Sequence, residues 1–187
     1  MNRIHQWLCS SASWARTVER HYLPWALDGA TLGSDVLEIG PGYGVTTRVL
    51  ARGQHALTAV ELDPVLAERV KKQLAPRVDV VVGDGTRLPF EPETFSSVVC
   101  FTMLHHVRSR ALQDRLFAEA LRVLRPGGTF AGADSLGSFG FRVLHLGDTM
   151  VVVDPATLPQ RLEAAGFRDV HVEISTRGAF KFRGVRG

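Results

Sequence analysis

Short apolar runs alternate with helical segments from residue 35 to residue 133, and this alternation strongly limits the fold that the chain can adopt. The apolar runs predict buried strands at residues 36–39, 56–62, 78–82, 97–102 and 129–133. The intervening segments predict helices at residues 45–52, 63–75 and 109–125. Strand–helix–strand order implies parallel strands joined by right-handed crossovers. We therefore predict an open α/β sheet that is covered by helices on both faces.

The two ends of the chain depart from this rhythm. Residues 155–165 predict a helix, and polar and apolar residues then alternate along residues 169–174 and 179–185, which indicates an antiparallel hairpin. Apolar residues at helical spacing within residues 1–33 predict one or two amphipathic helices outside the sheet. Since 187 residues suit one domain, we predict a helical lid over residues 1–33 on a domain formed by residues 34–187.

Composition excludes several classes of protein. The uncharged stretches are far shorter than the roughly 18 apolar residues that a membrane-spanning helix requires, so no membrane span is expected. Cys9 and Cys100 are too few for a disulfide framework, and we expect a reduced, cytoplasmic protein. Arg3 and His5 near the start also argue against a signal peptide. No spacing of His and Cys is typical of zinc, and no metal site is predicted.

A glycine turn follows the first predicted strand. Gly40, Gly42 and Gly44 allow the backbone to approach a ligand closely, and the helix that starts there presents free N–H donors. Glu61 lies 21 residues after Gly40 at the end of the second strand, the spacing of a carboxylate that binds ribose hydroxyls. This pattern predicts a cofactor that contains ribose, the alternative being a structural turn beside an exposed Glu. NAD is disfavoured because Val45 stands where its fingerprint has a third glycine.

Four stretches, in this order and spacing, resemble the class I S-adenosylmethionine-dependent methyltransferases of the small-molecule type. The stretches are residues 36–44, 60–64, 83–90 and 121–128. The resemblance implies a Rossmann-like three-layer sandwich with a mostly parallel seven-stranded sheet, an antiparallel last strand and an N-terminal helical cap. It also implies that residues 34–187 bind S-adenosyl-L-methionine.

The resemblance assigns the methionine and ribose end of this cofactor to the first two stretches. Gly40, Gly42 and Gly44 would pass beneath the methionine and ribose groups. Glu38 would help to hold the methionine end, and Glu61 would accept hydrogen bonds from the ribose hydroxyls. Carboxylates are favourable in such a cleft because the cofactor carries a sulfonium and an ammonium charge.

The adenine end is assigned to other positions. Asp84 would accept a hydrogen bond from the adenine amino group, with Gly85 beside the ring. Leu62 and Phe101 could form apolar walls.

Candidate catalytic residues follow the fourth and fifth predicted strands. Methyl transfer from a sulfonium depends mostly on positioning, and a base is needed only where the acceptor must lose a proton. Either His105 or His106 could be that base, and Asp134 could orient an amine or a hydroxyl. A similar Leu-His-His stretch occurs in the ubiquinone/menaquinone-biosynthesis-like branch of the family. The structural alternatives are a helix cap or a cofactor contact for each His, and a turn for Asp134.

We therefore predict a methyltransferase that acts on a small molecule. No Asn-Pro-Pro-Tyr-type stretch follows the fourth strand and no nucleic-acid module is appended, so a nucleic-acid partner is not expected. Two alternatives remain. One is a non-catalytic regulatory protein that binds S-adenosylmethionine or S-adenosylhomocysteine. The other is a nucleic-acid methyltransferase that binds through Arg177, Lys181, Arg183 and Arg186. The exposed edge of the hairpin could also pair two chains as a homodimer.

Overall fold

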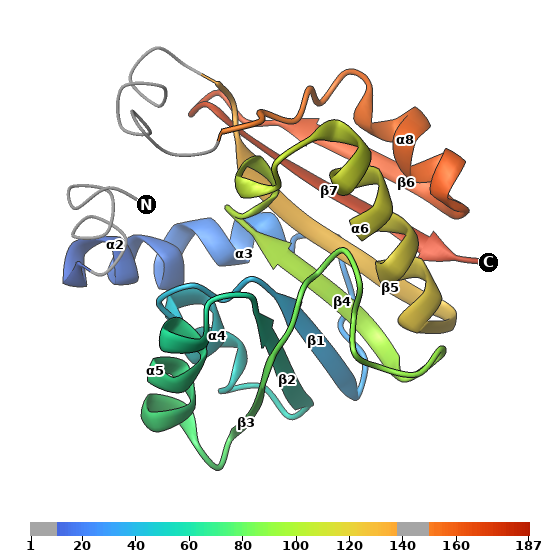
Figure 1. Cartoon of the computed structure of the whole chain (residues 1–187). Coiled ribbons are helices and arrows are strands. Elements are labelled where there is room, and N and C mark those ends of the chain that lie inside the picture. Colours follow the sequence, from blue (N-terminus) through green and yellow to red (C-terminus); the bar gives the residue numbers. More distant parts are fainter. Residues whose placement is uncertain (1–10, 138–149) are drawn as a thin grey trace.

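A twisted seven-stranded sheet forms the centre of the computed structural model, which describes residues 11–137 and 150–187 (Figure 1). The strand order across the sheet is β3-β2-β1-β4-β5-β7-β6. The strands are β1 Asp35–Ile39, β2 Ala56–Glu61, β3 Val78–Val82, β4 Phe95–Phe101, β5 Leu124–Ser135, β6 Phe167–Ile174 and β7 Ala179–Arg186. Pairs among β1 to β5 are parallel, whereas β7 runs antiparallel to both β5 and β6. The predicted sheet and its antiparallel last strand are confirmed.

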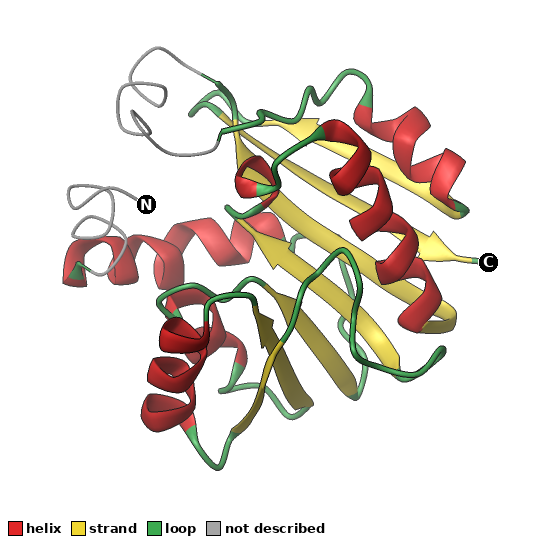
Figure 2. Ribbon diagram, in the orientation of Figure 1, coloured by secondary structure: helices red, strands yellow, loops and turns green. Residues whose placement is uncertain are grey.

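Helices cover both faces of this sheet (Figure 2). The helices are α2 Ala12–Thr17, the π-helix η1 Val18–Tyr22, α3 Leu23–Ala26, α4 Val45–Leu50, α5 Pro64–Leu74, the 3-10 turn η2 Leu104–His106, α6 Arg110–Val123 and α8 Leu158–Ala165. The segment from α2 to α3 lies with α4 and α5 on one face, while α6 and α8 lie on the other (Figure 1). This arrangement is the predicted three-layer sandwich.

Alternation of side chains along the strands divides the apolar core into two layers. Val36 and Val99 point to the layer that also holds Val18 and Leu23 of the N-terminal segment. The other layer is rich in aromatic rings, and Phe130 packs there 5.1 Å from Phe182, measured between ring centroids. Both faces of the sheet are therefore buried, as the apolar strand sequences predict.

Local signals explain where most elements begin and end. Asp63 caps α5 by accepting the N–H of Val65 at 2.8 Å, and Pro64 occupies the first turn, where no N–H is needed. Gly166 ends α8 in the left-handed conformation, as predicted. The helix predicted at residues 45–52 ends earlier, at Leu50, and that predicted at 155–165 begins later, at Leu158. β5 begins before the predicted residue 129, because Leu124 pairs with Phe95 ahead of a register shift.

The N-terminal segment packs on the sheet from Val18 onward, whereas α2 before it has no buried residue. Val18, Leu23 and Ala26 are buried against it, and the aromatic rings of Trp14 and Tyr22 lie 5.8 Å apart. The predicted lid also includes residues 1–10, which lie outside the described residues, and its movement stays a prediction. Across the two described ranges, no helix combines the length and the apolar character that crossing a membrane would require.

Candidate functional site

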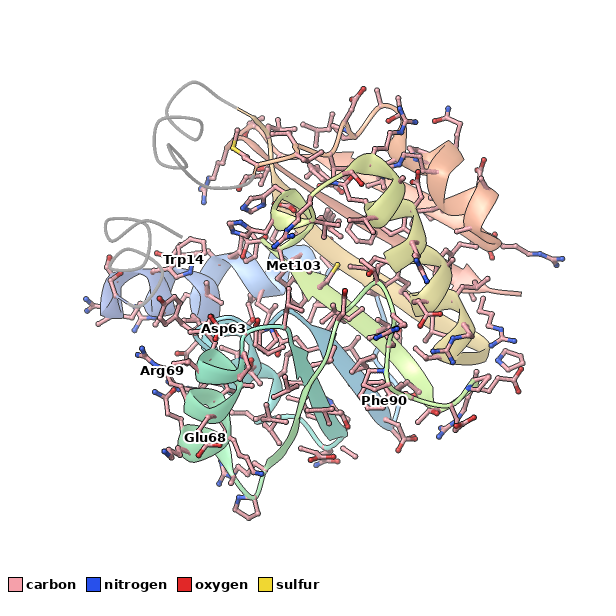
Figure 3. The ribbon with its side chains drawn as sticks, viewed as in Figure 1. Trp14, Asp63, Glu68, Arg69, Phe90 and Met103 are labelled. Atoms are coloured by element: carbon pink, nitrogen blue, oxygen red, sulfur yellow. The ribbon has the colours of Figure 1, made fainter. Side chains whose placement is uncertain are left out.

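The glycine turn leaves β1 at the edge of the sheet where the parallel strands end. Gly40, Gly42 and Gly44 have φ angles of 70°, 55° and 74°, a region that favours glycine. A Cβ atom at Gly40 would lie 3.1 Å from Cε of Met103, which follows β4 (Figure 3). A Cβ atom at Gly42 would have no neighbour within 4 Å. The turn is therefore packed on one side and open above Gly42, where a ligand could approach the backbone.

Glu61 fastens this turn from the end of β2. Its Oε2 accepts the Gly42 N–H at 2.9 Å, and its Oε1 accepts the Asp63 N–H at 3.0 Å. Only 7% of the residue is exposed. Each carboxylate oxygen has two lone pairs, so Glu61 retains capacity to accept from ligand hydroxyls. The structure thus joins two features that the sequence analysis linked only by spacing.

Glu38 lies deeper, within β1. It is buried, and its Oε1 accepts a hydrogen bond from the Thr46 hydroxyl of α4. Burial raises the pKa of Glu38 from its ordinary 4.5 to about 7, although the hydroxyls of Thr46 and Thr47 oppose this rise and Glu61 adds to it. A positive charge nearby would favour the ionised form of this carboxylate.

Some of the residues predicted to contact adenine are exposed, and others are buried. Asp84 is exposed, and its Oδ1 accepts both the N–H and the hydroxyl of Thr86 at 2.8 Å. Leu62 is 65% exposed at the end of β2. A Cβ atom at Gly85 would lie 2.7 Å from Cγ2 of Ile39, so this backbone is tight against the end of β1. Phe101 is buried in the core and lines no open surface in this structure.

The structure joins His105 and Asp134 into one buried pair. Nδ1 of His105 lies 2.6 Å from Oδ1 of Asp134, and the His105 backbone N–H donates to Oδ2 at 3.0 Å. A carboxylate accepts hydrogen bonds, so the histidine tautomer that suits this contact is the one with its proton on Nδ1. The side chains are 3% and 1% exposed, respectively. This burial suits a pair that fixes the turn more than a group that touches an acceptor.

His106 is the more accessible of the two histidines. It is half-buried, and its ring centroid lies 4.1 Å from that of His105 at an angle of 43°. Both belong to η2, directly after Met103, whose side chain contacts the position of Gly40. Of the two candidate bases, His106 is therefore the one with the more exposed side chain.

Two polar side chains that the sequence analysis did not single out also contact this region. Tyr22 donates its hydroxyl to the carbonyl of Ala133 at 3.1 Å, next to Asp134. Gln113 of α6 donates to the carbonyl of Leu104 at 3.1 Å, next to His105. The sequence did contain a signal for a buried polar contact at Gln113, because this polar residue shares the face of a predicted helix with its apolar residues.

Internal contacts engage part of the basic C-terminal run. Lys181 is buried and pairs with Asp28 at 3.2 Å and Glu173 at 3.3 Å. Arg186 pairs with Glu93 at 2.7 Å and donates to backbone carbonyls at the end of α6. Among the residues that the structure describes, no group of three or more His, Cys, Asp or Glu is placed to hold a metal ion.

Comparison with known sequences matches residues 37–132 to a family described as "methyltransferase domain". The chain is 34% identical over 105 residues to a probable ribosomal RNA small subunit methyltransferase A of Pyrobaculum aerophilum. It is 37% identical over 108 residues to the phthiotriol/phenolphthiotriol dimycocerosates methyltransferase of Mycobacterium tuberculosis. These matches cover 51% and 54% of this chain, but only 46% and 38% of the respective relatives. The chain thus spans less than half the length of these relatives.

A solved structure matches the whole fold. It is a methyltransferase of Thermotoga maritima, described as S-adenosylmethionine-dependent and a possible histamine N-methyltransferase. The TM-score is 0.78 at 19% sequence identity, and the match covers 100% of this chain and 95% of the other. At this level of identity, the likeness establishes the fold.

Proposed function

This chain belongs to the class I Rossmann-like family of S-adenosylmethionine-dependent methyltransferases, and on this premise we propose that it methylates a small molecule. The observation that carries the cofactor part of the proposal is the hydrogen bond between Glu61 and the Gly42 N–H. This bond holds a carboxylate beside an open stretch of backbone, and a ribose requires both. The cofactor, when bound, supplies a methyl group on a positively charged sulfur.

The proposed cofactor contacts follow from this arrangement. Gly40, Gly42 and Gly44 would lie beneath the methionine and ribose groups, while Glu61 accepts from the ribose hydroxyls. Glu38 acts from behind the turn, since its buried carboxylate favours a cation nearby.

The adenine contacts are proposed for residues beyond β2 and β3. Leu62 and Asp84 are exposed at these strand ends, where an adenine ring would cover the apolar side chain. Gly85 would lie beside the ring. Phe101 is buried and would form an apolar wall behind the site.

His106 is the proposed base for an acceptor that must lose a proton. The His105–Asp134 pair holds the turn that carries it, and Met103 keeps that turn against Gly40. An imidazole can take a proton near neutral pH and return it to water after methyl transfer. Transfer itself requires an acceptor aligned with the methyl group and shielded from water.

Ion pairs that two of the basic residues form within the chain favour a small acceptor over a nucleic acid. Lys181 and Arg186 are bound to carboxylates of this chain, so they are poor phosphate ligands. One relative is nevertheless named for ribosomal RNA, and a nucleic-acid acceptor is the second candidate.

Titration calorimetry with S-adenosylmethionine, S-adenosylhomocysteine and NAD tests the cofactor proposal. We expect binding of the first two and none of NAD, with affinity falling at least about tenfold in Glu61→Gln, the effect of losing a charged hydrogen bond. Glu68→Gln is the matched control because Glu68, on α5 (Figure 3), forms an exposed ion pair with Lys72. Absence of binding by the folded wild-type protein would refute the proposal.

Formation of S-adenosylhomocysteine separates the enzyme from a non-catalytic binding protein. A panel of small hydroxyl and amine compounds and a ribosomal RNA fragment is incubated with the cofactor. Turnover with a small compound supports the proposed class, and turnover with RNA alone assigns the second candidate. Tight binding with no turnover on either would favour the regulatory alternative.

A further inference from the structure

A buried amide on α6 also contacts the histidine turn. Gln113 lies on α6 and is 1% exposed. Its Nε2 donates to the carbonyl of Leu104 at 3.1 Å and to that of Val151 at 2.8 Å. Both N–H groups of one side chain thus connect η2 to the segment that leads into α8.

Arg161 of α8 fixes which way this amide points. Its guanidinium donates to Gln113 Oε1 at 2.9 Å, so Nε2 faces the two carbonyls. The same guanidinium donates to Asp114 at 2.7 Å and lies 5.2 Å from the ring centroid of Phe117. Its side chain is buried, and its fork of donors therefore holds a rigid orientation.

Val151 links this amide back to His105. The Val151 N–H donates to the His105 carbonyl at 2.8 Å, while its own carbonyl accepts from Gln113. The turn is therefore held by Asp134 at the end of β5, by Gln113 on α6 and by the backbone of Val151. A change at any of these points would move both histidines.

We propose that Gln113 is a positioning residue for methyl transfer, because it sets the Leu104–His106 turn and hence the place of His106. The inference rests on the proposed function of His106. The choice of side chain follows from the geometry, since only a neutral amide both accepts from Arg161 and donates to two carbonyls here.

Gln113→Glu tests the positioning with the smallest change in shape. The carboxylate still accepts from Arg161 but cannot donate, and it repels the carbonyls of Leu104 and Val151. Asp114→Asn is the matched control, since it alters another partner of Arg161 and leaves both carbonyl contacts of Gln113 intact. Arg161→Lys is a second variant that removes the fork and keeps the charge.

Exchange of the His105 Nδ1 proton, followed by NMR, is the first readout and needs no acceptor. We expect exchange about tenfold faster in Gln113→Glu, a smaller change in the same direction in Arg161→Lys, and none in Asp114→Asn. Unchanged exchange in folded Gln113→Glu would overturn the proposal. If that variant fails to fold, unchanged exchange in Arg161→Lys would overturn it.

Turnover of the acceptor identified for the wild type is the second readout. We expect kcat to fall about tenfold in Gln113→Glu with the KM for S-adenosylmethionine within about twofold. Loss of cofactor affinity with unchanged kcat would contradict positioning. A wild-type protein that binds no cofactor would refute the proposed function instead, and the proton-exchange result would still stand.

Discussion

At the residue scale, Glu38 is the side chain whose burial most clearly changes its chemistry. A pKa of about 7 instead of 4.5 means that folding favours the protonated form. The wild-type protein should therefore lose stability as the pH rises from 4.5 to 7, and lose no more from this group above pH 7. The total corresponds to about 3 kcal/mol.

Glu38→Gln should abolish this loss, because the amide does not titrate and still accepts from Thr46. Urea unfolding of both proteins at pH 5 and pH 8 measures the effect. The unfolding free energy of the variant, taken relative to that of the wild type, should be about 2–3 kcal/mol higher at pH 8 than at pH 5. The idea fails if the difference is the same at the two pH values.

Alanine substitutions at Gly42 and Gly127 distinguish the effect of backbone strain from the effect of ligand contact. Both have a positive φ, 55° and 76°, and a Cβ atom at either would have no neighbour within 4 Å. Alanine at each should therefore lower the free energy of unfolding by about 1–2 kcal/mol through backbone strain alone.

Only Gly42→Ala should also weaken cofactor binding, by about tenfold or more, because its methyl group enters the space above the turn. Calorimetric titration of both variants gives the comparison. Equal affinity in the two variants would mean that no ligand approaches Gly42.

At the scale of elements, Tyr22 connects the N-terminal helices to β5. Its hydroxyl donates to the Ala133 carbonyl, and burial raises its pKa well above 10, so it stays a neutral donor. Tyr22→Phe should cost about 1 kcal/mol in unfolding free energy and speed proteolysis near residue 20.

Thr17→Ala is the control on the same segment, since the Thr17 hydroxyl bonds only to the exposed turn before it. Its proteolysis should match the wild type. Equal protection in all three proteins would show that the Tyr22 hydroxyl adds nothing to the packing of Val18 and Leu23 in holding this segment.

The start or the buried face of a helix could be predicted where a single local sequence signal determined it. Asp63-Pro64 predicted the start of α5, and the apolar stripe of α6 predicted its buried face. The pairing of His105 with Asp134 was not predictable, because only the neighbouring positions of β4 and β5 bring these residues together across 29 positions of sequence. The face of the sheet to which Phe101 points was not predictable for a similar reason, since a strand sequence alone does not tell which face a helix will cover.

At the scale of the whole molecule, the basic C-terminal run follows β7 along the sheet, from Lys181, which pairs with Ala133 of β5, to Arg186 at the far end of the strand. The sequence suggested four cations for a nucleic-acid surface, yet the fold binds Lys181 and Arg186 to its own carboxylates. Ion pairs within the chain lower the number of counterions that RNA could release on binding. Charge counted along a sequence therefore overstates the charge offered to a partner.

The salt dependence of RNA binding measures how many of these four cationic side chains contact phosphates. If only Arg177 and Arg183 contact phosphates, the slope of log K against log salt for single-stranded RNA should be about −1.4, from about −0.7 for each contact. Four contacts would give about −2.8.

Filter binding at several salt concentrations distinguishes these values. If the wild-type slope is about −1.4, Arg177→Gln should reduce it to about half that magnitude. A slope near −2.8 would mean that Lys181 and Arg186 leave their carboxylates for RNA, and the small-molecule acceptor would then give way to a nucleic acid.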